Sequence, residues 1–277
     1  MTTAVAPPTG RRPGPITIPQ LVARKGENRR FAMVTAYDYP TARLAAEADI
    51  PVILVGDSVG NNALGYPSTL PVTMEDMLHH ARAVVRGAPD RVLVGDMPFG
   101  SYHASNEQAI ANAVAFIKVG MHSVKLEGGG RVAGIAKLLV ERGIPVMGHL
   151  GLTPQHANVF GGFRVQGRTA AARERILADA AALAEAGAWS IVLEGVPRDL
   201  AKEVTGSVAI PTIGIGAGPD CDAQVLVVYD LLGITRDPMP KFAQAFGDLG
   251  DRAVAAFRAF SDAVESGAFP DNEHSYH

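Results

Sequence analysis

Four hydrophobic runs of this sequence each end in a carboxylate, a residue type that can hold a cation or move a proton. The four acids are Asp57, Asp96, Glu127 and Glu194. The runs before them are short and rich in β-branched residues, and helical stretches separate them, which is typical of buried parallel strands. In a closed α/β barrel, chemistry takes place where the strands end. The sequence therefore predicts four acids on one rim, where a metal, a lysine or a bound proton must offset their repulsion.

Asp57 and Asp96 are predicted to bind Mg²⁺. Each follows a glycine, Gly56 or Gly95, which we interpret as room for a ligand beside the backbone. Mg²⁺ prefers hard oxygen ligands and takes one or two carboxylates. Zinc is disfavoured because no cluster of histidine and cysteine has ligand spacing. An aspartate at a strand end can simply cap the next turn, but two matched Gly-Asp ends favour a metal site.

Lys125 and Glu127 are predicted to face the barrel mouth together, because residues i and i+2 of a strand point to the same side. A lysine at that position can bind a substrate carboxylate and offset the negative charge of the acids. The alternative is a buried salt bridge between these two residues alone.

Glu194 follows the sixth predicted strand, across the barrel mouth from the second and third strands. That position is poor for a metal ligand, and the apolar residues beside Glu194 favour a desolvated general base. The alternative is an acid stabilised by a helix dipole.

Two polar residues near these acids have less specific interpretations. Ser58 follows Asp57 and can donate a hydrogen bond to a substrate carboxylate, or it is a simple turn residue. His149 ends the fifth predicted strand, where a lone histidine is usually part of the core.

Eight predicted strands alternate with helices over about 220 residues, which favours a (β/α)₈ TIM barrel. An open doubly wound sheet is the alternative, and it usually has a Gly-rich turn after its first strand. Here the first strand is followed by Tyr37-Asp38-Tyr39-Pro40. The strands are expected at 31–37, 52–56, 92–95, 123–126, 145–148, 190–193 and 211–215, with a helix and an eighth strand within 222–232.

Outside the barrel, residues 1–15 are predicted to form a flexible N-terminal tail, and residues 16–277 to form one domain. A short helix is expected at 17–25, before the first strand. Segment 241–267 is predicted to be helical, with an apolar stripe that must pack on the barrel or on another subunit. The stripe consists of Phe242, Phe246, Leu249, Phe257, Phe260 and Val264.

Composition limits the partners and the compartment. The chain has 277 residues, is 47% hydrophobic and has a net charge of -3, and it has no basic block that would indicate nucleic acid. No apolar run approaches the roughly 20 residues of a membrane span. The single cysteine, Cys221, excludes an internal disulfide and suits a reducing compartment. We therefore expect a cytoplasmic protein with neither a nucleic acid nor a membrane partner.

Several longer motifs are similar to those of ketopantoate hydroxymethyltransferase (3-methyl-2-oxobutanoate hydroxymethyltransferase), a family of pantothenate biosynthesis. The resemblance covers residues 15–277. It rests on Thr35-Ala36-Tyr37-Asp38, Val55-Gly56-Asp57-Ser58, Ser68-Thr69-Leu70-Pro71-Val72-Thr73, Lys125-Leu126-Glu127-Gly128-Gly129, Gly148-His149-Leu150-Gly151-Leu152-Thr153-Pro154-Gln155, Gly161-Gly162-Phe163-Arg164-Val165-Gln166-Gly167 and Gly214-Ile215-Gly216-Ala217-Gly218.

The resemblance implies a (β/α)₈ barrel that moves a hydroxymethyl group from 5,10-methylenetetrahydrofolate to 3-methyl-2-oxobutanoate, giving 2-dehydropantoate. It also implies Mg²⁺ as the metal and a homodecamer of two pentameric rings. By motif, the metal ligands are Asp57, Asp96 and Glu127, the substrate-binding residues are Asp57, Ser58, Asp96 and Lys125, and the proton acceptor is Glu194.

Two other functions fit some of these features. A phosphoenolpyruvate mutase or isocitrate lyase-like enzyme is also a Mg²⁺ barrel acting on oxoacids, but it needs a cysteine- or phosphate-handling loop, and Cys221 is badly placed for the former. A non-catalytic barrel would be indicated by the loss of one of the acids, and all four are present.

Overall fold

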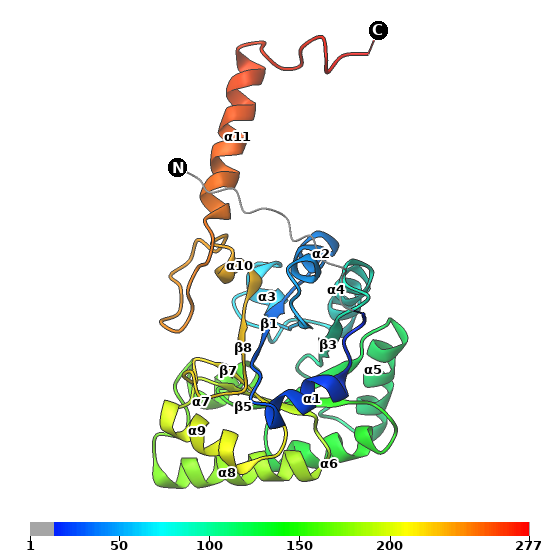
Figure 1. The fold of residues 1–277 in the computed structure, drawn as a ribbon, viewed down its shortest axis with the longest axis vertical. Helices are drawn as coiled ribbons and strands as arrows, with labels where there is room; N and C mark the ends of the chain where they lie inside the picture. The colour runs from blue at the N-terminus through cyan, green and yellow to red at the C-terminus, as the bar shows by residue number, and fades with distance from the viewer. Residues whose placement is uncertain (1–13, 277) are drawn as a thin grey trace.

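The computed structural model describes residues 14–276, which contain a closed barrel of eight parallel strands (Figure 1). The strands follow one another around the barrel in chain order, and β8 pairs with β1 to close it. The prediction of a (β/α)₈ barrel is confirmed, and the open sheet is excluded. The strands are β1 Phe31–Thr35, β2 Val52–Val55, β3 Val92–Asp96, β4 Ser123–Glu127, β5 Val146–Gly151, β6 Ser190–Glu194, β7 Thr212–Ile215 and β8 Ala223–Leu226.

Helices surround the strands, and several of them begin at a side-chain cap. In α4, for example, Thr73 and Asp76 form the reciprocal capping box that satisfies free N–H groups of the first turn. The helices are α1 Ile18–Gly26, α2 Tyr39–Glu47, α3 Val59–Asn62, α4 Met74–Gly87, α5 Asn106–Lys118, α6 Gly130–Val140, α7 Ala157–Phe160, α8 Ala170–Glu185, α9 Arg198–Ser207, α10 Val228–Leu231 and α11 Leu249–Glu265, with a 3₁₀ turn at Pro154–His156.

The period of two along each strand separates two cores. One side chain of each pair, such as Leu54 or Val94, points into the barrel, where it packs with Met33 and Ile213. The next residue along the strand, such as Leu93, packs outward against the helices. The inward row ends at the C-terminal mouth, so a polar residue at the last inward position of a strand must face the mouth.

The last barrel unit contains the predicted helix and eighth strand of 222–232, but it departs from the regular alternation of strands and helices. Strand β8 comes first and α10 follows it, whereas no helix lies between β7 and β8, a stretch the structure fully describes. The short connection, 216–222, brings β8 directly back beside β7.

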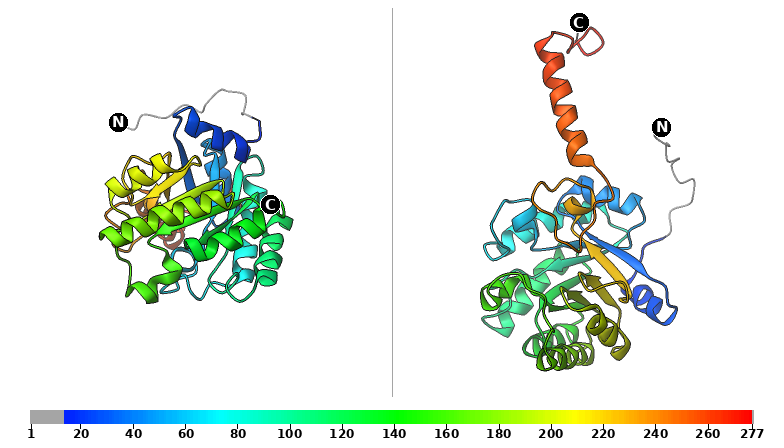
Figure 2. Two further views of the ribbon diagram at one scale, coloured as in Figure 1. Left: turned by 90° about the horizontal axis from the view of Figure 1, so that it is seen from below. Right: turned by 90° about the vertical axis from the view of Figure 1, so that its left-hand side faces the viewer.

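The C-terminal helix α11 projects away from the barrel (Figures 1 and 2). It begins at Leu249, so the prediction of helix from residue 241 is wrong for 241–248. Pro238 and Pro240 come just before that segment and disfavour a helix there. A hydrogen bond from Phe246 N to Leu231 O holds the segment against α10. Of the predicted tail, residues 1–13 lie outside the described part of the chain, and the next two residues, 14–15, are exposed coil.

Candidate active site

Three of the predicted acids meet at the barrel mouth. Asp57 follows β2, Asp96 ends β3 and Glu127 ends β4, and these strands are neighbours in the barrel. One oxygen of each carboxylate lies within 4.8 Å of the others, and all three side chains are buried. The backbone also joins the group, because Asp57 N donates to Asp96 Oδ2 at 3.1 Å. The expected cluster is therefore present. Asp96 and Glu127 are at the last inward positions of their strands, and Asp57 joins them from the turn after β2.

The glycine before Asp96 has a different role from the predicted one. Gly95 points outward, and a Cβ there would lie 2.4 Å from the ring of Phe116 on α5. A Cβ on Gly56 would lie 2.8 Å from Ser58 Oγ. The glycines therefore permit helix packing and a tight turn, and the interpretation as room for a ligand is wrong for Gly95.

Lys125 lies among the acids as the charge argument requires. Its Nζ is 2.8 Å from Asp96 Oδ1 and 3.3 Å from Glu127 Oε1, and all three side chains are buried. The Asp96 contact is an ion pair without hydrogen-bond alignment. Burial alone would lower the pKa of Lys125, but the neighbouring carboxylates raise it, so the ammonium stays charged. The salt bridge with Glu127 exists, as one part of this larger network.

The acids do not share the negative charge equally. Burial, together with repulsion from Asp96 and Glu127, raises the pKa of Asp57 well above its ordinary value. Burial also raises the pKa of Asp96, against the attraction of Lys125. Burial acts the same way on Glu127, but Lys125 and His149 outweigh it and lower the Glu127 pKa. A cation between the carboxylates would relieve this repulsion.

The donor set fits a hard metal ion. All three side chains offer only carboxylate oxygen, the ligand type of Mg²⁺ and Ca²⁺. Asp96 Oδ1 is buried and makes no hydrogen bond within residues 14–276. Such an oxygen retains a lone pair for a cation, so the cluster can bind a metal.

His149 connects this cluster to the fourth acid, a role that its sequence position did not reveal. Its Nδ1 is 3.1 Å from Lys125 Nζ and 3.3 Å from Glu127 Oε1, and its Nε2 is 3.3 Å from Glu194 Oε2. The last contact is within ion-pair reach but is not aligned as a hydrogen bond. Burial and Lys125 both lower the pKa of His149, but the two glutamates outweigh them and raise it.

Glu194 ends β6, on the far side of the mouth from β2 and β3, as predicted. Its side chain is 16% exposed, whereas Glu127 is 1% exposed. It lines the same cavity as the other three acids but does not belong to their cluster. The expectation that Glu194 stands apart needs one correction, because His149 bridges it to Glu127.

Gln155 was also missed from the sequence as a site residue. Its Nε2 donates to Asp57 Oδ2 and to Met97 O, each at 2.9 Å, and its backbone N donates to Glu127 Oε2 at 3.0 Å. Tyr102 in turn donates to Gln155 Oε1 at 2.7 Å, which fixes the amide. Gln155 lies on the 3₁₀ turn of the loop after β5, and only its motif could have singled it out.

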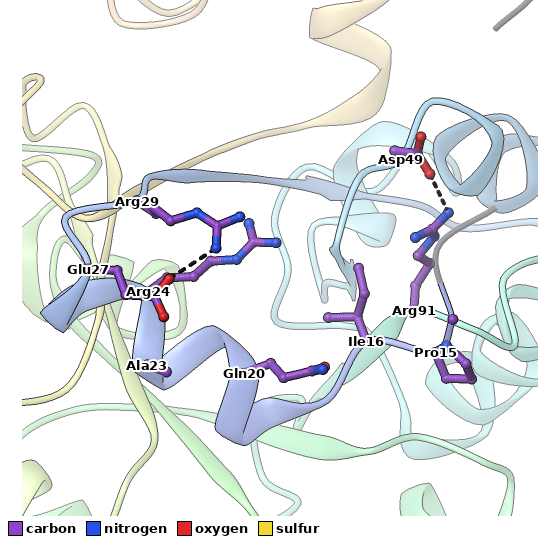
Figure 3. A pocket seen from close by; sticks show the side chains of 10 residues that line it. Pro15, Ile16, Gln20, Ala23, Arg24, Glu27, Arg29, Asp49 and Arg91 are labelled. Carbon is purple, nitrogen blue, oxygen red and sulfur yellow. Dashed lines mark hydrogen bonds and ion pairs between the residues drawn. The ribbon is translucent and has the colours of Figure 1, made fainter. Parts of the chain in front are cut away.

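The four acids, Lys125 and Ser58 line one cavity of about 510 Å³ at the C-terminal mouth. Ser58 Oγ is 2.9 Å from Tyr37 Oη, either of which can donate. A separate cavity of about 530 Å³ lies beside α1 at the opposite end (Figure 3). Its charged side chains include the ion pairs Arg29–Glu27 and Arg91–Asp49. The N-terminal end of a barrel usually serves stability, so chemistry belongs to the first cavity.

The family model described as ketopantoate hydroxymethyltransferase matches residues 15–272. The chain belongs to this family. The resemblance inferred from motifs is thereby confirmed, and the match covers all the site residues described above.

Relatives named 3-methyl-2-oxobutanoate hydroxymethyltransferase agree with this assignment. The protein of Moorella thermoacetica is 54% identical over 94% of this chain and 97% of its own length. That of Rhodococcus jostii is 53% identical over 92% of this chain and 89% of its own length.

Among solved structures, phosphonopyruvate hydrolase has a TM-score of 0.60 at 15% identity, covering 95% of this chain and 92% of its own. A 2,3-dimethylmalate lyase of the PEP mutase/isocitrate lyase superfamily has a TM-score of 0.59 at 17% identity, covering 93% and 91%. At such identity the likeness concerns the barrel fold alone. No helix within residues 14–276 is both long and apolar enough to cross a membrane.

Proposed function

We propose that this protein transfers a hydroxymethyl group from 5,10-methylenetetrahydrofolate to 3-methyl-2-oxobutanoate, producing 2-dehydropantoate for pantothenate synthesis. The observation that carries the proposal is the buried cluster of Asp57, Asp96 and Glu127 with Lys125, opposite Glu194 in one cavity. In a chain of this family, that arrangement suits enolisation of a small oxoacid followed by carbon–carbon bond formation.

Asp57 and Asp96 would hold Mg²⁺, with Glu127 as the third acid. When bound, Mg²⁺ supplies Lewis acidity at the ketone oxygen of the substrate, an effect worth several kcal/mol for developing charge. Lys125 is charged and buried beside these acids. Once a divalent cation offsets the charge of the acids, its ammonium can donate hydrogen bonds to the substrate carboxylate. Ser58 lines the cavity and can donate its hydroxyl hydrogen to the same carboxylate.

The balance of charges in the site supports the assignment of Mg²⁺ and Lys125. Three protein carboxylates and one substrate carboxylate carry four negative charges, and Mg²⁺ with Lys125 returns three positive charges. The raised pKa of His149 favours its cationic form and brings the site close to neutral. A buried site near neutrality avoids the large cost of unpaired charge.

Glu194 would act as the general base. It takes the proton from C3 of the oxoacid, and the C–H electron pair becomes the enolate. The methylene bridge first opens to an iminium as one C–N bond pair returns to nitrogen, which takes a proton. One water then adds to the iminium carbon, which leaves as formaldehyde while the second C–N bond pair returns to nitrogen, giving tetrahydrofolate. The enolate C3 then bonds to that carbon, and the new alkoxide takes a proton, which Glu194 can return. General base catalysis is typically worth about 10²–10⁴ in rate.

A product assay tests the proposed function against its rival. Purified protein, 3-methyl-2-oxobutanoate and 5,10-methylenetetrahydrofolate should give 2-dehydropantoate with Mg²⁺, and none after chelation with EDTA. Omission of the folate should leave C3 proton exchange but no net carbon transfer. Cleavage of a carbon–carbon or carbon–phosphorus bond in the oxoacid without folate would instead favour a mutase- or lyase-like enzyme. No turnover of any kind would favour a non-catalytic barrel.

The C-terminal helix supports an oligomer. Phe257 and Phe260 on α11 are 73% and 59% exposed, and the helix does not pack on its own barrel within the described residues (Figure 2). Of the two predicted partners for this stripe, this exposure supports another subunit. We propose a homo-oligomer, and family resemblance favours a decamer.

The cellular setting of this reaction is also a proposal. The only cysteine, Cys221, is a buried free thiol, which suits the reducing cytoplasm. The partners of such an enzyme are small-molecule substrates, and neither nucleic acid nor a membrane is needed.

A further inference from the structure

The catalytic cavity is larger than its oxoacid substrate requires. The cavity measures about 510 Å³. A water molecule in the liquid occupies about 30 Å³, and the oxoacid has eight non-hydrogen atoms, so even at that generous allowance it fills roughly half of the space. The remainder lies between the acids and the solvent, because Asp57, Asp96 and Glu127 are at the buried end. This outer half therefore has room for a second ligand.

Besides the loop after β2, the segments after β5 and β8 line this cavity. Phe163, in the loop after β5, is 62% exposed and lines the cavity. Phe242, in the segment after α10, is 43% exposed and lines it too. Two exposed phenyl rings in one cavity mouth are costly in water and suit the faces of a flat ligand.

Phe242 packs against the backbone at the end of β7. Its ring packs on Gly216 at the end of β7, where an added Cβ would lie 2.9 Å from it. Gly216 also has a φ of +63°, a conformation that disfavours other residues. The short β7–β8 connection thus packs against an aromatic ring that lines the cavity, just after Ile215, the register partner of Glu194.

Asp230 places a carboxylate in the same cavity, and the reaction outlined above does not use it. It lies on α10, is 8% exposed and lines the cavity. Thr235 donates to its Oδ1 at 2.6 Å, the one hydrogen bond made to this carboxylate side chain by any residue of 14–276. The other oxygen is left for a ligand. A buried carboxylate held by one donor is oriented to accept from a second, paired donor.

We infer that the outer half of this cavity binds the pterin ring of the one-carbon donor. Phe163 and Phe242 cover its faces, and Asp230 accepts hydrogen bonds from the adjacent N–H groups of its amino-pyrimidinone edge. This inference rests on the proposed function. It places the donated carbon on the Glu194 side of the oxoacid, so that C3 has the general base and the electrophile on one side and the acids of β2–β4 on the other.

Charge in the cavity agrees with this occupant. Among the described residues that line it, Lys125 is the only lysine or arginine, and it lies at the buried end. Glu194, Asp230 and Asp237 make the outer half negative. An iminium carbon formed when the methylene bridge opens is cationic and gains from that field, whereas an anionic group would be repelled.

Two variants test the subsite, with tetrahydrofolate as the binding probe and Mg²⁺ present. Asp230→Asn should raise the dissociation constant of tetrahydrofolate at least tenfold, since hydrogen bonds to charged groups contribute about 1.5–3 kcal/mol. Phe242→Ala should raise it by a similar factor through lost stacking. Phe246→Ala is the matched control, because Phe246 lies in the same segment but does not line the cavity.

The oxoacid serves as an internal reference for folding and for the first half of the reaction. Both variants should keep wild-type C3 deuterium exchange and an unchanged KM for the oxoacid, while the KM for the folate rises. The inference is overturned if tetrahydrofolate binding is unchanged in both variants, if oxoacid exchange falls in parallel, or if Asp237→Asn weakens folate binding as much as Asp230→Asn does. Absence of exchange and turnover in the wild-type protein would instead overturn the proposed function.

Discussion

At the scale of single residues, the site assigns different tasks to chemically similar acids through their surroundings. Asp57, Asp96 and Glu127 are buried together, and their repulsion prepares them for a cation. Glu194 lies across the mouth with a partly exposed carboxylate. His149 lies between the two groups and contacts both Glu127 and Glu194, so it can hold the base in place without binding metal.

Replacing the proposed base should separate binding from proton transfer. Glu194→Gln keeps the side-chain shape and should still bind Mg²⁺ and the oxoacid, but deuterium exchange at C3 should fall by about 10²–10⁴. Proton NMR of 3-methyl-2-oxobutanoate in D₂O measures the exchange. Glu185→Gln, at the exposed end of α8, is a control that should exchange like the wild type. Exchange retained in Glu194→Gln would exclude this residue as the base.

The raised pKa of Asp57 predicts a pH dependence for metal binding. Protons compete with Mg²⁺ for this carboxylate, so metal affinity measured by isothermal titration should rise with pH. The sign for stability is the opposite. Native Asp57 binds its proton more tightly than unfolded Asp57, so the metal-free protein should lose stability as pH rises from the ordinary aspartate pKa through the raised one.

Asp57→Asn provides the matching variant. It should melt at a higher temperature than the wild type without metal at neutral pH, show a weaker dependence of that temperature on pH, and gain little from added Mg²⁺. Asp179→Asn, on α8, serves as the control and should keep the wild-type gain from Mg²⁺. An unchanged metal affinity in Asp57→Asn and also in Asp96→Asn would contradict the ligand assignment.

At the scale of elements, the barrel positions the site through the alternation of its strands. Lys125 and Glu127 both face inward on β4, while Leu126 between them packs on the helices. Outward positions are constrained just as strongly, because helices pack closely on the sheet. Gly95 shows this, since Phe116 of α5 fills the space where its side chain would be.

The variant Gly95→Ala tests whether that glycine serves packing. Overpacking a filled core typically costs about 1–3 kcal/mol, and each kcal/mol lowers Tm by about 2–4 °C in a protein of this size. Gly134→Ala on α6 is the matched control, because an added Cβ there has no neighbour within 4 Å and alanine favours helix. If both variants melt alike, helix packing does not explain Gly95.

At the scale of the whole molecule, the described chain combines a closed barrel with a projecting helix, α11, whose first turn is held by residues 232–236. The apolar stripe of α11 includes Leu249, Phe257, Phe260 and Val264, all exposed. Large exposed apolar surfaces generally mark association sites. The barrel mouth is complete in one subunit, so assembly through α11 is not required to form the acid cluster.

A double variant tests whether α11 mediates assembly. Phe257→Asp with Phe260→Asp should dissociate the oligomer, because two charges would be buried in an apolar contact. Analytical ultracentrifugation measures the mass. Arg258→Glu, on the same helix but outside the stripe, is the control for altered charge. A wild-type protein that sediments as a monomer would contradict the proposal, and so would a double variant that stays fully assembled.

The barrel and the residues of its inward rows follow from local sequence patterns. Short β-branched runs between helices allow few other folds, and the period of two placed Asp96, Lys125, Glu127 and Glu194 at the mouth. A local pattern can predict which residues face inward because side-chain alternation along a strand depends only on neighbouring residues. The family motifs added the reaction.

Only the tertiary structure decided which distant residues complete the site. Gln155 reaches Asp57 from 98 residues away, and His149 joins two acids from different strands. Phe242 was predicted on a helical stripe but lies in the cavity over Gly216, while α11 leaves the barrel. Such contacts depend on how loops fold back and what space the barrel leaves, which no local sequence pattern specifies.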